Sequence, residues 1–442
     1  MTVTILPTSA PRTSPSAQTV GPYGPDGPPI GTGRPPIGTG STGRERPVAL
    51  HREDAPAVAE RLAPRLAERA AAADRAGTFC VEDLADLRAS GLLGLMVPTR
   101  LGGSGAGFAD YAEVATRLAA GSGATALVYN MHASVTGALS LTPDDVARQL
   151  GAPESYFAMR DRFLTAAAAG SFYAVAMSER GAGSRLSSMT TTYEATPDAL
   201  GWRIRGSKAF CSGAGHADAY LVAGHPPGDP GTVSQFVVPA DAPGIVVDAT
   251  WDALGMRATG SQDVTFDVTV DSDALLGGME GLGLLLAQAM PQWLVASYAA
   301  VYVGVARSAV DGAVAYLRER GLTGLPAVRA RVGRADAAVA AAHAVVRTAA
   351  QAIDTDPGSE DTNRWVWRAK LLAGTTAHDV SASMLEAAGT GATRRGSTLE
   401  RLYRDARCGS LQPATSDVCA DWLGAAALGG DADNPVEGPA RW

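Results

Sequence analysis

The hydrophobic and polar positions along the chain change their period twice. Apolar residues recur at helical spacing over 57–76 (AVAERLAPRLAERAAAADRA) and 81–98, and a longer stretch of the same kind begins at FADYAEVATRL. This spacing gives a helix one apolar face, and alanine, which is abundant here, favours helix. The sequence therefore predicts an N-terminal helical domain over 48–168.

From about residue 169 the segments become short and rich in β-branched and aromatic residues, with turn residues between them. The segments are SFYAVAMS, TTTYEATP, GWRIRGSKAF, AYLVAGH, SQFVVPA, GIVVDATW and DVTFDVTV. Such a series predicts a central β domain over 169–275.

Long helical patterns return over 276–442, starting with GLGLLLAQAMPQWLVASYAAVYVG. Helices, then strands, then helices predict an α+β chain of three domains. The last helices are apolar on several sides, which favours burial in an oligomer interface. Residues 1–47 differ from all of this: they are rich in Pro, Gly, Ser and Thr, repeat PPIGTG, and are predicted to be a disordered tail.

Composition narrows the classes of function. The 442 residues are 46% hydrophobic and 19% charged with a net charge of −8, which suits a globular protein and argues against general nucleic-acid binding. The four cysteines and six histidines show no metal-type spacing, so we expect no metal site and a reducing, cytoplasmic setting. We find neither a secretory signal pattern nor an apolar run of about 18 residues, so we expect no membrane span.

Candidate chemistry begins with MSERGAGSRL (177–186), directly after the first predicted strand. Glycine permits positive φ, and successive free N–H groups with serine hydroxyls form a concave anion site. By itself this loop is either a cradle for a phosphate or flavin edge or an ordinary turn. It is followed by GSKAFCSGAGHADAYLV, WDALGMRATGSQDVTFDVTV and LERLYRDARCGSLQPATSDV.

These four segments, in this order, resemble the acyl-CoA dehydrogenase superfamily of flavoproteins, and the resemblance covers about 48–442. It implies an acyl-CoA-dehydrogenase-like α+β fold with an N-terminal helical domain, a central β-barrel-like domain and a C-terminal four-helix domain. It also implies FAD bound near a subunit boundary in a homotetramer or homodimer.

The resemblance places several flavin contacts in the glycine-rich loop. The Met177 backbone and Ser178 would meet the pyrimidine edge of the flavin, while Gly183 and Ser184 would lie at its pyrophosphate. Thr415, in the last of the four segments, is a further candidate cofactor contact.

Other contacts implied by the resemblance come from elsewhere in the chain. Phe210 would pack on the isoalloxazine ring, unless it is ordinary barrel core, and Ser212 would approach the reactive nitrogen edge. Arg320 and the loop Gly389-Thr390-Gly391 would reach the flavin of a neighbouring subunit, although Arg320 could equally be a solvated helix end. The glutamine expected before that loop is Leu385, which weakens the adenine side of the site.

A residue needed for the family's commonest reaction is missing. Oxidation of an acyl thioester requires a carboxylate over the α-carbon as base. In many family members this Glu follows shortly after an R-D-A segment, which matches Arg404-Asp405-Ala406, a pair that we interpret as structural. The position of the Glu falls here on Pro413, and the alternative position on a helix over 291–298 holds no carboxylate.

Two residues are candidates for the missing role. Asp417 could be a displaced base, although a carboxylate just after Thr-Ser is more simply a helix N-terminal charge. His132 could act as base or orient an oxygenated flavin, since its pKa is near neutral, but a buried core histidine is the simpler interpretation. Tyr298 and Tyr302 could line the pocket or serve as packing.

Three functions remain open for an FAD-dependent oxidoreductase of this kind. α,β-Desaturation of an acyl thioester on CoA or a carrier protein comes first, because it is the family's commonest activity and a base can relocate. A two-component monooxygenase, using O₂ and FMN or another reduced flavin, fits the missing Glu. A non-catalytic scaffold comes third. The expected partners are a small-molecule or acyl-thioester substrate, an electron-transfer partner or flavin reductase, and further copies of the chain.

Overall fold

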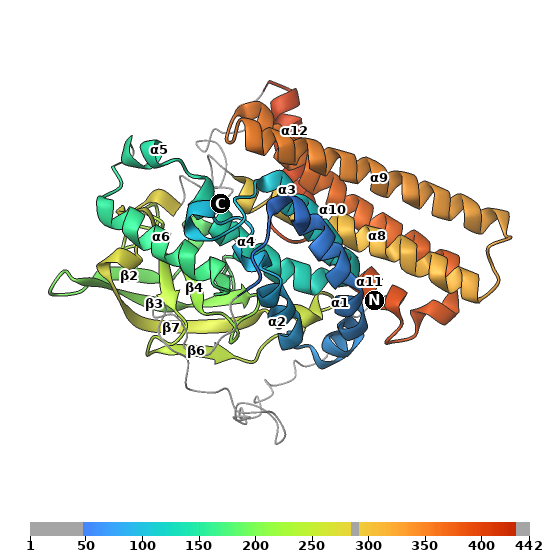
Figure 1. Cartoon of the computed structure of the whole chain (residues 1–442), viewed down its shortest axis with the longest axis horizontal. Helices are drawn as coiled ribbons and strands as arrows, with labels where there is room; N and C mark the ends of the chain where they lie inside the picture. The colour runs from blue at the N-terminus through green and yellow to red at the C-terminus, as the bar shows by residue number, and fades with distance from the viewer. Residues whose placement is uncertain (1–46, 150, 284–290, 430–442) are drawn as a thin grey trace, which may run out of the picture.

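The computed structural model describes residues 47–149, 151–283 and 291–429, so the predicted tail over 1–47 lies almost wholly outside the described residues (Figure 1). Helices come first, strands second and helices last, which confirms the predicted fold class. The N-terminal helices are α1 (Ala55–Ala76), α2 (Val81–Ala89), α3 (Phe108–Gly121), α4 (Gly123–Leu141), α5 (Asp144–Gln149) and α6 (Glu154–Ala168).

The stretch predicted as one helix from Phe108 onward is in fact two. Ser122 ends α3 and caps α4, because its hydroxyl accepts a hydrogen bond from the Thr125 N–H at 3.2 Å. The helix that follows, α4, is buried on all sides over most of its length and lies between the strands and the C-terminal helices (Figure 1). It therefore forms the wall that the other two regions share.

All seven predicted strands are present. They are β1 (Tyr173–Ala176), β2 (Thr192–Ala195), β3 (Gly201–Cys211), β4 (Ala219–Gly224), β5 (Ser234–Pro239), β6 (Ile245–Asp248) and β7 (Gln262–Asp271). They form one sheet of order β1-β4-β5 and a second of order β2-β3-β7-β6. The β1–β4 pair is parallel and the other pairs are antiparallel.

The register of the β3–β7 ladder shifts between Lys208 and Cys211. Such a bulge redirects side chains. Phe210 lies in it with a φ of 58°, a left-handed conformation that is uncommon outside glycine. This irregularity therefore decides where an aromatic ring of the candidate site points.

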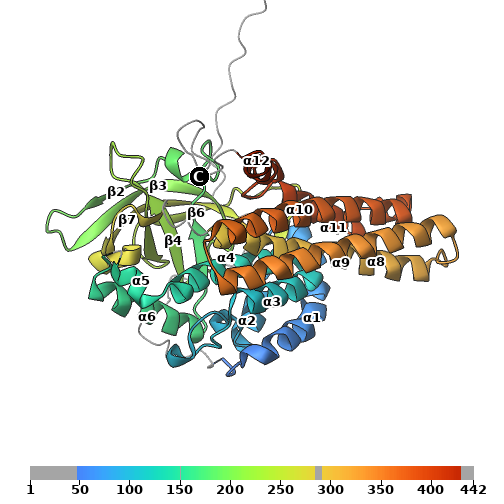
Figure 2. The ribbon, with the colours of Figure 1, turned by 90° about the horizontal axis from the view of Figure 1, so that it is seen from above.

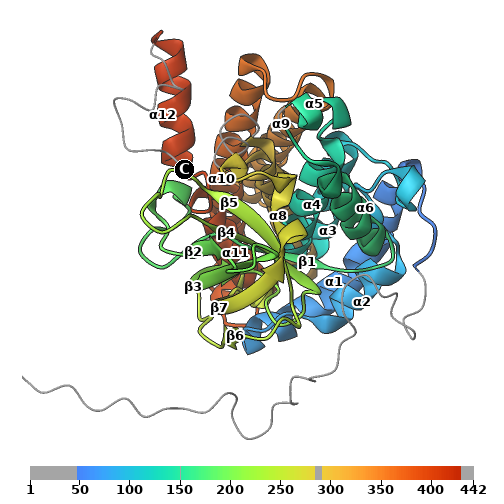
Figure 3. The same ribbon diagram turned by 90° about the vertical axis from the view of Figure 1, so that its left-hand side faces the viewer.

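The C-terminal helices are α8 (Ala296–Glu319), α9 (Pro326–Thr355), α10 (Glu360–Ala388), α11 (Thr398–Arg407) and α12 (Ser416–Ala427). α8, α9 and α10 form a bundle that extends away from the strands (Figure 2). The stretch Pro291–Glu319 is long and apolar enough to cross a membrane, yet 78% of its most apolar window is buried, as in a core helix. α12 stands beside the bundle (Figure 3), and the ring of its Trp422 lies 4.1 Å from that of Trp367 on α10, with the two ring planes tilted by 52°.

Candidate functional site

The loop after β1 doubles back on itself. The Glu179 N–H donates to the Gly183 carbonyl at 3.0 Å, and the Gly183 N–H donates to the Glu179 carbonyl at 2.8 Å. Gly181 and Gly183 have φ values of 93° and 63°, which L side chains rarely adopt, and no atom lies within 4 Å of a Cβ built on either. Glycine is thus required by the backbone, and the loop faces open space on this side.

Beneath the loop lies a buried ion pair. Lys208 of β3 is fully buried, and its Nζ lies 2.8 Å from the Glu179 carboxylate. That carboxylate also accepts four hydrogen bonds, from the backbone N–H and hydroxyl groups of Thr190 and Thr191. Burial alone would raise the pKa of Glu179, but the Lys208 ammonium and these hydrogen bonds hold it at about 2. The loop therefore rests on a carboxylate with a full set of partners.

The segment that carries Phe210 and Ser212 lies against this loop, because the Ala209 N–H donates to the Ser178 carbonyl at 2.8 Å. Phe210 is 57% exposed and meets Trp251 edge-on at 6.0 Å, so it is not barrel core. Ser212 is largely buried, and its Oγ lies 2.9 Å from Ser261 Oγ. The exposed ring and the glycine loop form one continuous site.

An apolar cavity of about 110 Å³ opens beside Met177. Strands β1, β4 and β5, helices α4 to α6 and the segments near 276–283 and 293–294 line it. Its hydroxyl and amide side chains among the described residues are those of Ser134, Thr142, Tyr156 and Gln235. No carboxylate, histidine, lysine or arginine is among the described lining residues. The cavity thus offers hydrogen-bonding groups but no charged base.

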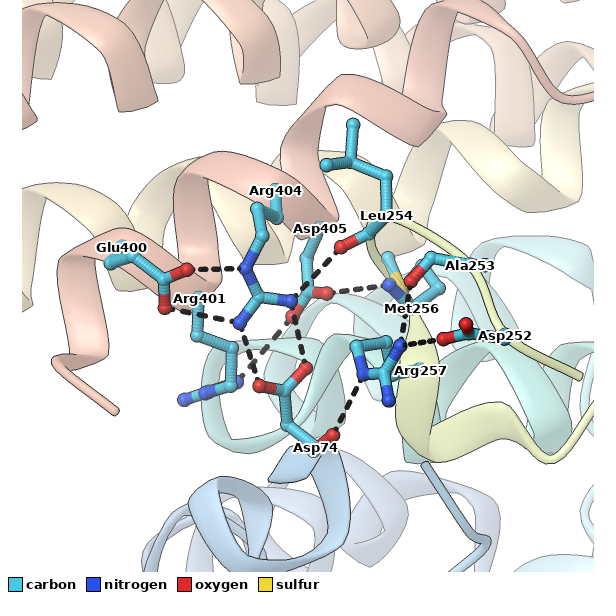
Figure 4. Close-up of polar contacts among 10 residues, drawn as sticks. All are labelled: Asp74, Asp252, Ala253, Leu254, Met256, Arg257, Glu400, Arg401, Arg404 and Asp405. Carbon is cyan, nitrogen blue, oxygen red and sulfur yellow. Dashed lines mark hydrogen bonds and ion pairs between the residues drawn. The ribbon is translucent and has the colours of Figure 1, made fainter. Parts of the chain in front are cut away.

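A charged junction joins the three regions of the chain (Figure 4). Arg404 of α11 binds both carboxylate oxygens of Asp74, at the end of α1, at 2.6 and 3.0 Å. It also donates to the Glu400 carboxylate at 2.6 and 3.1 Å and to the Leu254 carbonyl at 3.0 Å. Arg257 Nε donates to the Asp74 carbonyl at 3.0 Å. The Arg404-Asp405 pair therefore holds α11 against the other two regions.

The loop between α11 and α12 is fixed from below by Lys370 of α10. The Lys370 ammonium is fully buried and donates to the carbonyls of Gly409, Gln412 and Ala414 at 2.9, 3.0 and 2.8 Å. Tyr302, also fully buried, donates its hydroxyl proton to Gln412 Oε1 at 2.7 Å. The loop that would carry the family's glutamate is thus rigidly placed.

Comparison with known proteins identifies the family. Three acyl-CoA dehydrogenase family models match: the N-terminal domain over 51–144, the middle domain over 174–269 and the C-terminal domain over 282–428. The L-evernosamine nitrososynthase of a Micromonospora strain is 32% identical over 389 residues, covering 84% of this chain and 89% of that protein. The chain belongs to the acyl-CoA dehydrogenase family.

Other relatives in the acyl-CoA dehydrogenase family differ in activity. A putative acyl-CoA dehydrogenase of Bacillus subtilis is 29% identical, over 83% of this chain and 95% of its own length. The structure of FMN-bound TdsC, a dibenzothiophene monooxygenase from Paenibacillus sp. A11-2, superposes with a TM-score of 0.73 at 26% identity, over 85% of this chain and 97% of that one. The predicted flavin agrees with that relative.

The structure does not bring His132 to the cavity. Its Nε2 lies 2.7 Å from the Leu93 carbonyl, and its Nδ1 accepts a hydrogen bond from the Tyr173 N–H at 3.1 Å. Burial lowers the pKa of His132 to about 4. Both ring nitrogens are used in the core, so we assign no catalytic role to this histidine.

Asp417 is likewise away from the described cavity lining. It is exposed in the first turn of α12, where a negative charge interacts favourably with the helix dipole. Thr415 is the N-cap of the same helix and accepts a hydrogen bond from the Val418 N–H at 3.3 Å. The geometry supports helix capping by Thr415 and a helix N-terminal charge at Asp417, and not a displaced base.

The remaining candidates occupy two places. Arg320, Gly389 and Gly391 are all exposed where α8 and α10 end, at the end of the bundle away from the strands (Figure 2). They cannot reach the flavin that the same chain's Ser212 would contact. Tyr298 and Tyr302 are not among the described lining residues of the cavity. They pack between α8 and its neighbours, so the packing interpretation fits them.

Sequence reasoning missed the Glu179–Lys208 pair and the Lys370 contacts. One signal was present: Ile204, Gly206 and Lys208 share one face of β3 by its period of two, so Lys208 falls on the buried face. A lysine on such a face needs a partner. No comparable signal marked Lys370, because its acceptors are backbone carbonyls.

Proposed function

We propose that the chain is a two-component flavin-dependent monooxygenase, which oxygenates a small molecule with O₂ and reduced flavin delivered by a separate reductase. The observation that carries this proposal is the described lining of the cavity, which contains no carboxylate. A dehydrogenase needs a base within hydrogen-bond reach of the α-carbon. Oxygen transfer from a flavin does not need that base. This reverses the order in which the sequence alone ranks the two enzymes.

The flavin is proposed to lie across the glycine loop and the Phe210 segment. The positive-φ glycines leave open space there, which suits a planar cofactor, and Phe210 presents an exposed ring for stacking. Ser178, Ser184 and Ser212 bring hydroxyl groups to the same loop and segment. When bound, the flavin supplies the two electrons and the oxygen chemistry, while these residues bind and orient it.

FMN fits the chain better than FAD. The contacts expected for the far end of FAD, Arg320 and the Gly389–Gly391 loop, would have to come from another subunit. Leu385, at the position of the expected glutamine, packs partly buried against the core and offers no hydrogen bond. The solved relative TdsC also holds FMN. A cytoplasmic homo-oligomer remains the expected form.

The substrate is proposed to be uncharged and largely apolar. A ligand with a phosphate or carboxylate would find no cation in the described lining of the cavity, and burying an unpaired charge is costly. The four polar side chains would orient one or two polar atoms of such a substrate. This favours substrates like the aromatic sulfur compound in the name of the dibenzothiophene monooxygenase relative over a charged nucleotide sugar.

The test is reoxidation of the FMN-loaded protein. It is reduced anaerobically, mixed with oxygenated buffer in a stopped-flow instrument and followed by absorbance. We expect a long-lived intermediate before oxidised flavin returns, and oxygenated product from dibenzothiophene. Featureless reoxidation, together with desaturation of acyl-CoA substrates, would establish the dehydrogenase instead. Phe210→Ala, which removes the stacking ring, should lower FMN affinity, whereas the exposed Leu200→Ala on the same domain should not.

A further inference from the structure

Three hydroxyl groups stand in series behind the candidate site. Ser212 Oγ lies 2.9 Å from Ser261 Oγ, and Ser261 Oγ lies 2.6 Å from Thr259 Oγ1. Thr259 Oγ1 donates in turn to the Met256 carbonyl at 2.8 Å. All three hydroxyl residues are buried, with Thr259 fully so, and Ser212 lies two residues after Phe210.

A carbonyl at one end fixes the direction of every bond in this series. A carbonyl can only accept, and each hydroxyl has a single proton to donate. Thr259 gives its proton to Met256, so its oxygen must accept from Ser261. Ser261 has then used its proton and must accept from Ser212. With all three bonds made, the Ser212 proton is used in the bond to Ser261, and the Ser212 oxygen keeps a lone pair that can accept a further hydrogen bond.

The carbonyl that sets this direction is itself held in place. The Met256 N–H donates to Asp405 Oδ1 at 2.6 Å, and Met256 has a φ of 53° (Figure 4). Gly255 approaches the Arg404 carbonyl so closely that a Cβ would lie 2.1 Å from it. Asp405 and Arg404 belong to the charged junction, which therefore holds the peptide that precedes Met256. The Thr259 N–H donates to the Met256 carbonyl at 3.0 Å and holds the peptide that follows it.

We propose that this series makes Ser212 a hydrogen-bond acceptor toward the flavin, so that the site favours reduced over oxidised flavin. The inference rests on the proposed function and on the family resemblance, which implies that Ser212 approaches the reactive nitrogen edge. Reduced flavin carries a hydrogen on that nitrogen, N5, which can donate to the Ser212 lone pair. Oxidised flavin presents a lone pair on N5, which would face another lone pair. Ser261 and Thr259 are positioning residues, because they act only through Ser212.

Such a preference suits an enzyme that must capture flavin after a reductase has reduced it. Oxidised flavin is the competing species, since it is present wherever reduced flavin meets oxygen. Weaker binding of the oxidised form also lets oxidised flavin dissociate after the reaction. The residues thus add discrimination between two redox states of one ligand, which stacking and phosphate contacts do not supply.

The experiment compares dissociation constants of FMN in its two redox states, measured by anaerobic titration of the same protein. We expect the wild type to bind reduced FMN more tightly. Ser261→Ala releases the Ser212 proton to face outward, so the preference for reduced FMN should fall by about 5- to 10-fold, the worth of one hydrogen bond. The midpoint potential of bound FMN should fall correspondingly. Ser207→Ala, which removes an exposed hydroxyl bonded to Thr265 on the same ladder, is the matched control.

The ratio of the two constants separates this role from a structural one. A variant that merely loosens the site weakens both constants and leaves their ratio unchanged, and that result would overturn the proposal. Thr259→Val, which keeps the side-chain shape but frees the series from the Met256 carbonyl, should lower the ratio in the same direction if Ser261→Ala folds poorly. A wild type that binds FMN equally in both states refutes the inference alone. A wild type that binds no FMN refutes the proposed function as well.

Discussion

Two lysines of this chain, Lys208 and Lys370, are fully buried, and the fold accommodates their charges in different ways. Lys208 lies against the Glu179 carboxylate at 2.8 Å, beneath the glycine loop. Lys370 donates instead to three backbone carbonyls at 2.8–3.0 Å and holds the loop after α11. Burial lowers the pKa of both lysines, that of Lys370 to about 8. The Lys208 charge is neutralised by one opposite charge. The Lys370 charge is stabilised by the dipoles of three neutral carbonyls.

This difference predicts how strongly a single substitution destabilises each region. In an ion pair, removing one partner leaves the other charge buried without compensation, which is far more costly than losing a neutral hydrogen bond. Where carbonyls surround a lysine, removing the lysine leaves only neutral acceptors. The glycine loop therefore has a stronger anchor that is also more vulnerable to a single substitution.

The largest effect is expected from Lys208→Met. It leaves the Glu179 carboxylate buried without its cation, so the free energy of unfolding should fall by about 3–5 kcal/mol. Urea unfolding followed by circular dichroism measures the loss. The double variant Glu179→Gln/Lys208→Met removes both charges and should recover more than half of it. A double variant as unstable as Lys208→Met would show that charge pairing is not the cause.

A smaller effect is expected from Lys370→Met. Three carbonyls lose their donor but no charge is left unpaired, so the free energy of unfolding should fall by about 1–3 kcal/mol. The control on the same helix is Arg364→Met, whose exposed ion pair with Glu360 is worth at most about 1 kcal/mol. If Lys370→Met cost as much as Lys208→Met, the comparison of the two anchors would be wrong.

The smallest effect concerns acid. The pKa of Glu179 is about 2 in the fold, against an ordinary value of 4.5, so the unfolded chain binds a proton more readily than the folded chain. Its contribution to stability is complete well above pH 4.5, the ordinary pKa, and is lost as pH falls through that value toward 2. Between pH 5 and 4 the wild type should lose about 0.5–1 kcal/mol through this group. Glu179→Gln should not show this part of the loss. If the free energy of unfolding falls equally with pH in the two proteins, Glu179 is not the group responsible.

The order of helices and strands was predictable because each element carries its own period. All seven strand segments were recognised, since alternation and turn residues are local signals. The break between α3 and α4 was missed because apolar spacing continues through Ser122, and only the capping bond reveals the boundary. The parallel pairing of β1 with β4 was also not predicted, because no local pattern specifies which distant segment a strand will meet.

At the candidate site, the sequence located the loops but not what supports them. Gly183, Phe210 and Ser212 were predicted as flavin contacts because they stand in recognisable motifs, and that role stays a prediction. The direction of the Ser212 hydroxyl depends on Ser261, Thr259 and the Met256 carbonyl, about 50 residues away. All three lie in a recognised segment, but the sequence does not show how these groups are bonded to one another. The sequence made His132 a candidate base because the ordinary pKa of histidine is near neutral. In the structure, burial and two backbone partners place it in the core.

The bond between Arg404 and Asp74 spans 330 residues of chain, and this has a consequence for synthesis. At about 5–20 residues per second, α1 leaves the ribosome about 15–65 s before its partner on α11 exists. During that interval Asp74 and the end of α1 remain without their final contacts. The N-terminal helices therefore remain without this ion pair until α11 has been synthesised. A chain that ends before residue 404 never forms it.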